Sequence, residues 1–205
     1  MVSSEEIVSF AASISADELS ETVVDDAGRV LLDTIGCAIG AVNAPPVLAL
    51  RSIYGNYRCD EKMVTIIGSG ERLPLEYAAL INGTMVRYLD FNDGYRGPHG
   101  GCHPSDLIPA VLATAEAVEA NGRDLLEALV VAYEIQCAGV STGAVRTGGW
   151  DYVTWGTHAA TAAVGTLMGL SDVELIDALG MAVAANNAFE ITRFGLVSQW
   201  KGVAH

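Results

Sequence analysis

The sequence predicts an all-α fold that forms one domain over residues 1–205. Two observations carry this prediction: apolar residues recur at helical spacing along most of the chain, and serine–glutamate capping pairs stand at two candidate helix starts. The chain has 205 residues, 51% of them hydrophobic, which is enough apolar material for the core of one sizeable domain. No repeat period and no low-complexity linker divides it.

The first long helix is expected after the capping pair Ser15 and Glu18. Apolar side chains then continue at near-helical spacing from Leu19 to Ile39, until Gly40 and the break at residues 45–46. We expect this helix to be long and well buried.

The elements that follow are shorter. Pro46 is suited to begin the next helix, because proline fits the first helical turn. Residues 63–67, Met-Val-Thr-Ile-Ile, form the only convincing short strand, and residues 74–91 are predicted to be another helix.

The second half of the chain is predicted to be helices joined by two unusual loops. Five glycine and proline residues between Gly94 and Gly101 prevent any helix from continuing there. The second loop covers residues 146–151, and an irregular segment follows Arg193. The expected helices cover residues 105–120, 123–139, 156–169 and 172–187, the last opened by the capping pair Ser171 and Glu174.

The charge of the chain argues against two classes of partner. Asp and Glu number 25 against 11 Lys and Arg, giving a formal net charge of −14. Such a surface repels phosphate backbones and anionic membranes, so neither nucleic acid nor a membrane is expected as partner. The uncharged stretch from Tyr152 to Ser171 is long enough to span a bilayer, but it contains threonines, a histidine and glycines. We interpret it as a buried helix of a helical protein.

The N-terminus and the cysteines favour a cytoplasmic location. The first residues, Met-Val-Ser-Ser-Glu-Glu, lack the basic stretch and apolar run of a secretory signal. The four cysteines lie far apart and form no C-x-x-C pair, so they suggest neither a zinc ribbon nor a dense disulfide framework.

The segment from Asp90 to Asp106 is the strongest candidate for a functional site. It concentrates three aspartates, two histidines, an arginine and a cysteine between two predicted helices. Loops held by rigid helices commonly carry catalytic groups. The alternative is structural: Ser105 or Asp106 caps a helix and His103 is a hydrogen-bonded loop histidine.

Simpler motifs do not fit this segment. A calcium loop starting at Asp90 would need a carboxylate at its twelfth position, which is Gly101. His99, Cys102 and His103 are potential metal ligands, but they lie in a glycine-rich loop rather than on one helical face. No metal site is therefore predicted.

Two further residues are candidates on weaker grounds. His158 lies in the uncharged stretch, where a lone histidine is more often a hydrogen-bonded core residue than a catalyst. Lys201, one of only two lysines, stands in Ser-Gln-Trp-Lys-Gly at residues 198–202. Its ammonium is suited to receive a substrate carboxylate, although a surface lysine is the plainer interpretation.

Several motifs together resemble successive motifs of the MmgE/PrpD family. They are Leu-Asp-Phe-Asn-Asp at residues 89–93, His-Pro-Ser-Asp at 103–106, Gly-Trp-Asp at 149–151, Ala-Asn-Asn-Ala at 185–188 and the lysine motif at 198–202. They occur in the family's order, and the resemblance extends from Leu32 to the last residues. This family includes 2-methylcitrate dehydratase, cis-aconitate decarboxylase and iminodisuccinate epimerase.

The resemblance implies a large helical domain with a smaller α+β lid domain, a dimeric assembly, and an active site at the junction, with no metal or organic cofactor. Asp90, His103, His158 and Lys201 match the family's loop carboxylate, two histidines and lysine. We expect His103 to act as general acid or base, with Asp90 orienting it or sharing the proton transfer, His158 assisting, and Lys201 binding a carboxylate. Asn92, Asp93 and Ser105 are the further candidates for substrate binding.

The resemblance favours dehydration of a 3-hydroxy tricarboxylate, because Asn92 and Asp106 look closer to the methylcitrate dehydratase branch. Two departures matter: Gly94 stands where relatives commonly have a hydroxyl residue, and the sequence stops at His205, where relatives continue into the lid domain. The chain is therefore expected to need a second copy or a chain that carries the lid. Decarboxylation, epimerisation and a non-catalytic helical interaction module stay open as alternatives.

Overall fold

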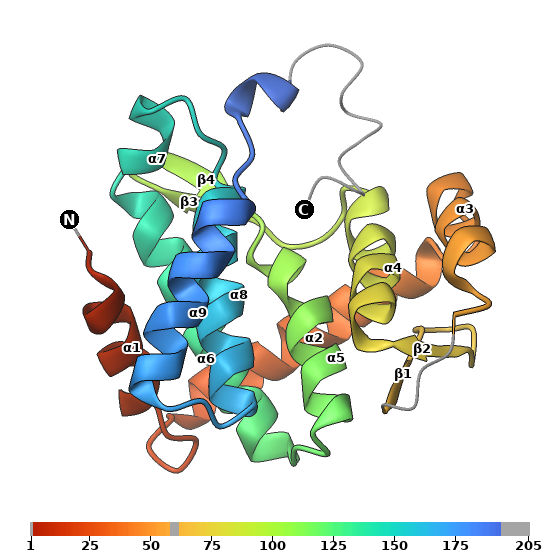
Figure 1. The fold of residues 1–205 in the computed structure, drawn as a ribbon, viewed down its shortest axis with the longest axis horizontal. Helices are drawn as coiled ribbons and strands as arrows, with labels where there is room; N and C mark the ends of the chain where they lie inside the picture. The colour runs from red at the N-terminus through yellow and green to blue at the C-terminus, as the bar shows by residue number, and fades with distance from the viewer. Residues whose placement is uncertain (1, 58–61, 194–205) are drawn as a thin grey trace.

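The computed structural model describes residues 2–57 and 62–193, and the fold of this part is all-α. Two antiparallel strand pairs of three residues per strand accompany the helices (Figure 1). The elements, in chain order, are α1 Ser4–Ser13, α2 Glu21–Gly40, α3 Pro45–Tyr54, β1 Met63–Thr65, β2 Arg72–Pro74, α4 Leu75–Tyr88, β3 Tyr95–Gly97, β4 Gly100–Cys102, η1 Pro104–Leu107, α5 Ile108–Ala117, α6 Gly122–Ser141, α7 Ala144–Thr147, α8 Val153–Leu167, α9 Asp172–Ala185 and η2 Glu190–Arg193.

The larger core lies among α1, α5, α6, α8 and α9, which stand side by side in Figure 1. Ala159, Ala162 and Ala163 of α8 are fully buried in it, and α6 contributes Ala128 and Ala132. Alanine has no side chain beyond Cβ, so the backbones of these helices approach closely. This core is therefore an array of tightly packed helices with small residues at their contacts.

A second core forms around α4, where the carboxyl-terminal half of α2, α3 and the β1–β2 pair meet. Val64 and Leu73, which are register partners across this strand pair, are both buried there. Ala113 of α5 belongs to this second core, whereas Val111 of the same helix belongs to the first. Helix α5 therefore joins the two halves of the molecule.

The predicted start of the long helix was wrong. The residue that caps α2 is Ser20, whose side chain accepts from the Val23 N–H, and Ser15 to Glu18 form a turn. A capping box does occur near the N-terminus, where Ser3 and Glu6 open α1. The pattern S-x-x-E fits several places in a polar stretch, and packing selects the start that puts apolar side chains in the core.

The expectation that α2 is well buried was also wrong. It runs for 20 residues as predicted, but Leu32 is 73% exposed and Ile39 is 53% exposed. Only Ala27, Thr34, Cys37 and Ala38 of this helix are buried. Helical spacing marks an apolar stripe, and whether another element covers that stripe depends on the rest of the fold.

The other differences are small and local. The segment predicted as a loop contains the hairpin β3–β4, and the strand predicted at 63–67 covers Met63–Thr65 and pairs with β2, so it is not the only strand. The helix predicted from residue 105 begins as the η1 turn and continues as α5, while α8 begins at Val153. Within the described residues no single helix is long and apolar enough to cross a membrane, and the only pair that passes together, α2 with α3, is bent by 84°.

Candidate active site

The candidate loop leaves α4 after Tyr88, forms the hairpin β3–β4, and enters η1 at Pro104. Asp90 has a φ of 55°, a left-handed conformation that few residues other than glycine adopt. The hairpin lies against α6, and a Cβ added to Gly97 would come within 2.6 Å of the Ser141 Oγ. Glycine at this position therefore permits the close approach of the loop to α6.

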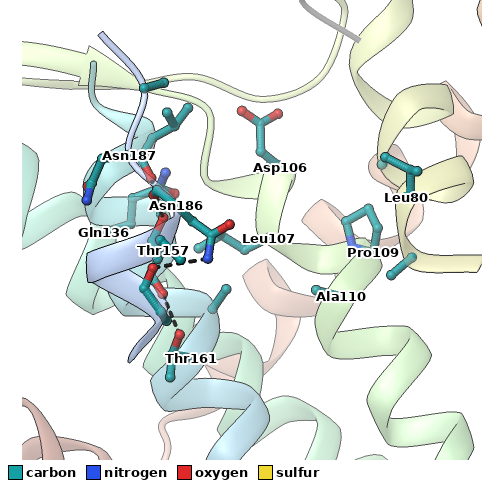
Figure 2. Close-up of a pocket in the computed structure, with 18 residues that line it drawn as sticks. Leu80, Asp106, Leu107, Pro109, Ala110, Gln136, Thr157, Thr161, Asn186 and Asn187 are labelled. Carbon is teal, nitrogen blue, oxygen red and sulfur yellow. Dashed lines mark hydrogen bonds between the residues drawn. The ribbon is translucent and has the colours of Figure 1, made fainter. Parts of the chain in front are cut away.

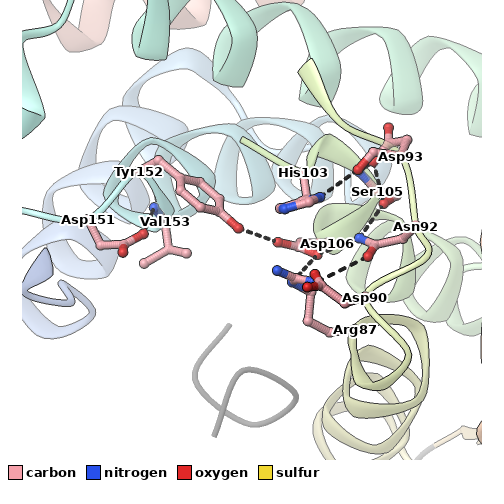
Figure 3. A network of polar contacts seen from close by, with 10 residues as sticks. All are labelled: Arg87, Asp90, Asn92, Asp93, His103, Ser105, Asp106, Asp151, Tyr152 and Val153. Carbon is pink, nitrogen blue, oxygen red and sulfur yellow. Dashed lines mark hydrogen bonds and ion pairs between the residues drawn. The ribbon is translucent and has the colours of Figure 1, made fainter. Parts of the chain in front are cut away.

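Asp93 anchors the loop to the elements around it (Figure 3). Its Oδ1 accepts hydrogen bonds from the Ser105 backbone N–H at 3.1 Å and from the Ser105 hydroxyl at 2.5 Å. Its Oδ2 accepts the hydroxyl of Tyr133 on α6 at 2.9 Å. Burial and the Asp93 charge raise the pKa of Tyr133, so this phenol stays protonated and continues to donate.

Asn92 joins the two ends of the same loop. Its Nδ2 donates to the Ser105 Oγ at 2.9 Å and to the Asp106 Oδ1 at 3.0 Å. Its Oδ1 accepts from the Arg87 Nη1 at 3.2 Å. Both ends of the amide are thus engaged, and Asn92 and Ser105 are buried.

Arg87, in the last turn of α4, is the buried cation of this region. It is only 1% exposed, forms an ion pair with Asp90, and places its Nε 3.6 Å from the Asp106 Oδ1. Burial disfavours the charged form, but the attraction of Asp106 and Asp90 outweighs it and raises the pKa of Arg87. Arg87 therefore carries a fixed positive charge beneath the loop.

His103 is held in one tautomer. Its Nδ1 lies 2.5 Å from the backbone carbonyl oxygen of Asp93, which can only accept, so Nδ1 carries the proton and Nε2 is the acceptor. Burial lowers the pKa of His103, and the positive charge of Arg87 lowers it further, against opposing contributions from Asp93 and Asp90. A neutral imidazole with a free lone pair on Nε2 is the form suited to accept a proton.

Tyr152 faces His103 from the beginning of α8. The two ring centroids are 6.1 Å apart, and the Tyr152 hydroxyl donates to the Asp106 Oδ2 at 3.1 Å. The segment before it is held by a backbone bond from Asp151 to Ala188 at 2.9 Å, next to the stacked rings of Trp150 and Phe189. Asp106 is therefore bonded from both sides of the site.

A cavity of about 640 Å³ adjoins this network at Asp106 (Figure 2). Asp106 is the only charged residue among the described residues that line it, and it is negative. Most of the wall consists of small side chains of α4, α5, α8 and α9, including Gly83, Ala110, Ala160 and Ala182. Such a wall provides no cation for a polyanionic ligand.

The structure brings together five of the residues predicted from sequence: Asp90, Asn92, Asp93, His103 and Ser105. His158 is not among the residues of this network. Its Nδ1 is bonded to the Thr154 carbonyl oxygen at 2.8 Å, one turn earlier in α8, and its ring lies 4.9 Å from that of Trp155. Lys201 lies outside the described residues.

Sequence reasoning missed four members of the network: Arg87, Asp106, Tyr133 and Tyr152. Arg87 had one signal, its place three residues before Asp90 at a helix end. Asp106 was noted as a possible helix cap and as part of the His-Pro-Ser-Asp motif, but it was not chosen as a site residue. The two tyrosines come from other helices, and no local pattern marks them.

The alternative of a metal site gains no support from the described residues, where no three His, Cys, Asp or Glu side chains gather as ligands. Cys102 is buried beside Cys137, and the contact with Cys137 together with burial raises its pKa. Its thiol is accordingly held in the protonated form.

Comparison with known proteins identifies relatives over nearly the whole chain. Residues 5–205 match the MmgE/PrpD N-terminal domain. The chain is 32% identical to 2-methylcitrate dehydratase of Escherichia coli (strain K12), covering 86% of this chain and 39% of that protein. It is 30% identical to cis-aconitate decarboxylase of Homo sapiens, with 86% and 38% covered. The chain thus spans about two fifths of the length of these relatives.

Proposed function

The chain belongs to the MmgE/PrpD family, and from this premise we propose that it carries the acid–base part of a dehydratase acting on a 3-hydroxy tricarboxylate. The observation that carries the proposal is His103, a half-buried imidazole whose Nδ1 is committed to a carbonyl and whose Nε2 is the acceptor. The names of the relatives in the 2-methylcitrate dehydratase group support this choice of reaction.

His103 is the general base of the proposed reaction. Its Nε2 takes a proton from the carbon next to a substrate carboxylate, and the electron pair of that C–H bond forms the double bond as the C–O bond breaks. The departing hydroxide takes the proton from the His103 imidazolium and leaves as water, which returns His103 to its neutral form. Asp90, half exposed at the rim of the network, shares the proton transfer or stabilises the imidazolium that forms on His103.

Asn92, Asp93 and Ser105 act in this proposal by holding His103. Ser105 is fully buried, and its hydroxyl is committed to Asp93 and Asn92. Asp93 fixes the His103 ring through its backbone carbonyl while its carboxylate ties the loop to Ser105 and Tyr133. Their role in substrate binding is thus to shape the site. His158 assists only if the completed enzyme brings it to the substrate.

A substrate with three carboxylates needs cations that the described network does not supply. Arg87 is buried and paired, and among the described residues the cavity wall carries only the negative charge of Asp106. Lys201 is proposed to bind one carboxylate, and further polypeptide is proposed to supply the rest. The open apolar cavity supports this requirement, because a second copy or a chain carrying a lid domain would cover it.

The test is to purify the chain with whatever polypeptides accompany it and to follow formation of a conjugated alkene from 2-methylcitrate by ultraviolet absorbance. His103→Gln should reduce turnover by about 100-fold or more, because a positioned general base contributes that much. His99→Gln, in the same loop but exposed, is the matched control and should retain turnover. Equal activity of wild type and His103→Gln would refute the assignment.

Decarboxylation is the second candidate, favoured by the 30% identity to a protein named cis-aconitate decarboxylase. The same preparation, supplied with cis-aconitate, separates the two reactions because only decarboxylation releases carbon dioxide. Epimerisation would appear as a change of configuration without loss of water or carbon dioxide. Substrate that neither reacts nor raises the melting temperature would favour a non-catalytic helical module.

A further inference from the structure

Arg87 is almost completely buried, yet it contacts three polar groups of the candidate site. It is 1% exposed and inside the last turn of α4. Its Nη1 bonds to Asp90 and to the Asn92 Oδ1, while its Nε points to the Asp106 Oδ1 at 3.6 Å. A buried charge is costly unless it is paired, so this arrangement needs an explanation.

We propose that Arg87 is a positioning residue, which sets the orientation of the carboxylates of Asp90 and Asp106 around His103. For catalysis the proposal rests on the dehydratase function given above. The geometric role itself concerns only the described residues and can be tested without substrate.

The first argument is the conformation of Asp90. Its φ of 55° is unfavourable for a residue with a Cβ, although aspartate tolerates it better than most. The Arg87–Asp90 ion pair and the bond from the Asp90 N–H to the Arg87 carbonyl at 3.3 Å stabilise this conformation. The chain therefore turns away from α4 directly at Asp90. The half-exposed carboxylate of Asp90 stays beside the loop that carries His103.

The second argument is the geometry of the guanidinium. Nη1 bonds to Asp90, which follows α4, and Nε lies 3.6 Å from the Asp106 Oδ1 in η1. A planar fork makes two such contacts at fixed relative positions, whereas a lysine ammonium is a single point charge on a flexible stem. Through Asp106 the constraint extends to Tyr152, which donates to the other carboxylate oxygen.

The third argument is electrostatic. The groups that face His103 are Arg87 from α4, Asp90 and Asp93 from the loop, and Tyr152 from α8. Arg87 is the only cation among them. Its charge, together with burial of the ring, lowers the pKa of His103, and this keeps the imidazole in the neutral form that the base needs.

The experiment compares Arg87→Lys and Arg87→Met with Arg51→Met. Arg51 is a matched control, because it also forms two bonds to one carboxylate, that of Glu71, but lies outside the site. Nuclear magnetic resonance titration of the imidazoles in the purified chain gives the pKa of His103, with its signals assigned from His103→Gln. Dehydration kinetics on the completed enzyme give kcat and KM.

Arg87→Lys should leave the pKa of His103 in place, because the charge remains, and should lower kcat by about 100-fold with little change in KM, because the fork is lost. Arg87→Met should raise the pKa of His103, and the acid limb of the pH–rate profile should move with it. Arg51→Met should change neither. If Arg87→Met does not fold, Arg87→Met/Asp106→Asn removes both buried charges together and should show the same rise.

Two results would overturn the proposal. One is an unchanged His103 titration in a folded Arg87→Met or in the double variant. The other is a rise in KM with unchanged kcat in Arg87→Lys, which would make Arg87 a substrate-binding group. If the wild-type protein shows no dehydration activity, the proposed function is refuted instead. The titration would still decide whether the charge of Arg87 lowers the pKa of His103.

Discussion

The polar network and the cavity meet at Asp106 but are built in opposite ways. The network comes mainly from one segment, residues 87–106, and joins charged and hydrogen-bonding side chains at short range (Figure 3). The cavity comes from helices far apart in sequence and is walled mostly by small apolar side chains (Figure 2). Under the proposed function, the network would therefore hold the reacting groups within one segment, and the cavity would need further polypeptide to enclose the substrate.

The largest expected effect comes from breaking the network at Asp93. In Asp93→Ala the Ser105 N–H, the Ser105 hydroxyl and the Tyr133 hydroxyl lose their common acceptor. Hydrogen bonds to a charged group contribute about 1.5–3 kcal/mol each, so we expect a loss of at least about 3 kcal/mol of unfolding free energy. Urea denaturation at neutral pH measures it.

The matched control for Asp93→Ala is Asp26→Ala, which removes an exposed ion pair with Arg29. Exposed pairs contribute little, so this variant should stay within about 0.5 kcal/mol of wild type. A loss of less than about 1 kcal/mol of unfolding free energy for Asp93→Ala would mean that the network does not hold the loop. The network and the cavity would then not differ in how strongly the chain itself holds them.

The next effect compares two alanines of α8. Ala162 is fully buried in the core, and Ala160 lines the cavity. Ala162→Leu should cost about 1–3 kcal/mol, because extra methyl groups in a packed core force neighbours to move. Ala160→Leu should stay within about 0.5 kcal/mol in the isolated chain and should instead weaken capture of any polypeptide that covers the cavity. Equal destabilisation of both variants would show that the cavity wall is packed core.

The sequence predicts those features of the fold that depend on local sequence patterns. The helices α2 to α6, α8 and α9 and their order were predictable, because helical spacing and turn residues are recognised over a few residues, whereas α1 and α7 were not predicted. The start of α2 at Ser20 rather than Ser15 was not, because both serines suit a cap and the choice depends on packing. The exposure of Leu32 was not predictable either, since it depends on what covers the helix.

The site shows the same division. Asp90, Asn92, Asp93, His103 and Ser105 lie within one segment, which its composition marked, and the family resemblance singled out these residues within it. Tyr133 and Tyr152 belong to α6 and α8 and reach the network only through the fold. The placement of His158 against Trp155 and the Thr154 carbonyl is likewise a property of helix orientation.

The smallest expected effect is the pH dependence that His103 adds to the free energy of unfolding. This effect should belong to the network alone and not to the cavity wall. Because the pKa of His103 in the folded chain lies below its ordinary value near 6.5, the unfolded chain binds the proton first. Wild type should therefore lose stability relative to His103→Gln as the pH falls below about 6.5, and the two should run parallel above it. Urea midpoints between neutral pH and pH ~5 test this, with His99→Gln following wild type.

Ala160→Leu should leave that pH dependence unchanged, because the cause of the low pKa is burial in the loop and the charge of Arg87, and neither belongs to the cavity wall. Parallel curves for wild type and His103→Gln at every pH would mean that the ring is not buried as described. A changed pH dependence of stability in Ala160→Leu would mean that the cavity wall influences the pKa of His103. Both outcomes are decided on the chain alone, so neither depends on the identity of the substrate.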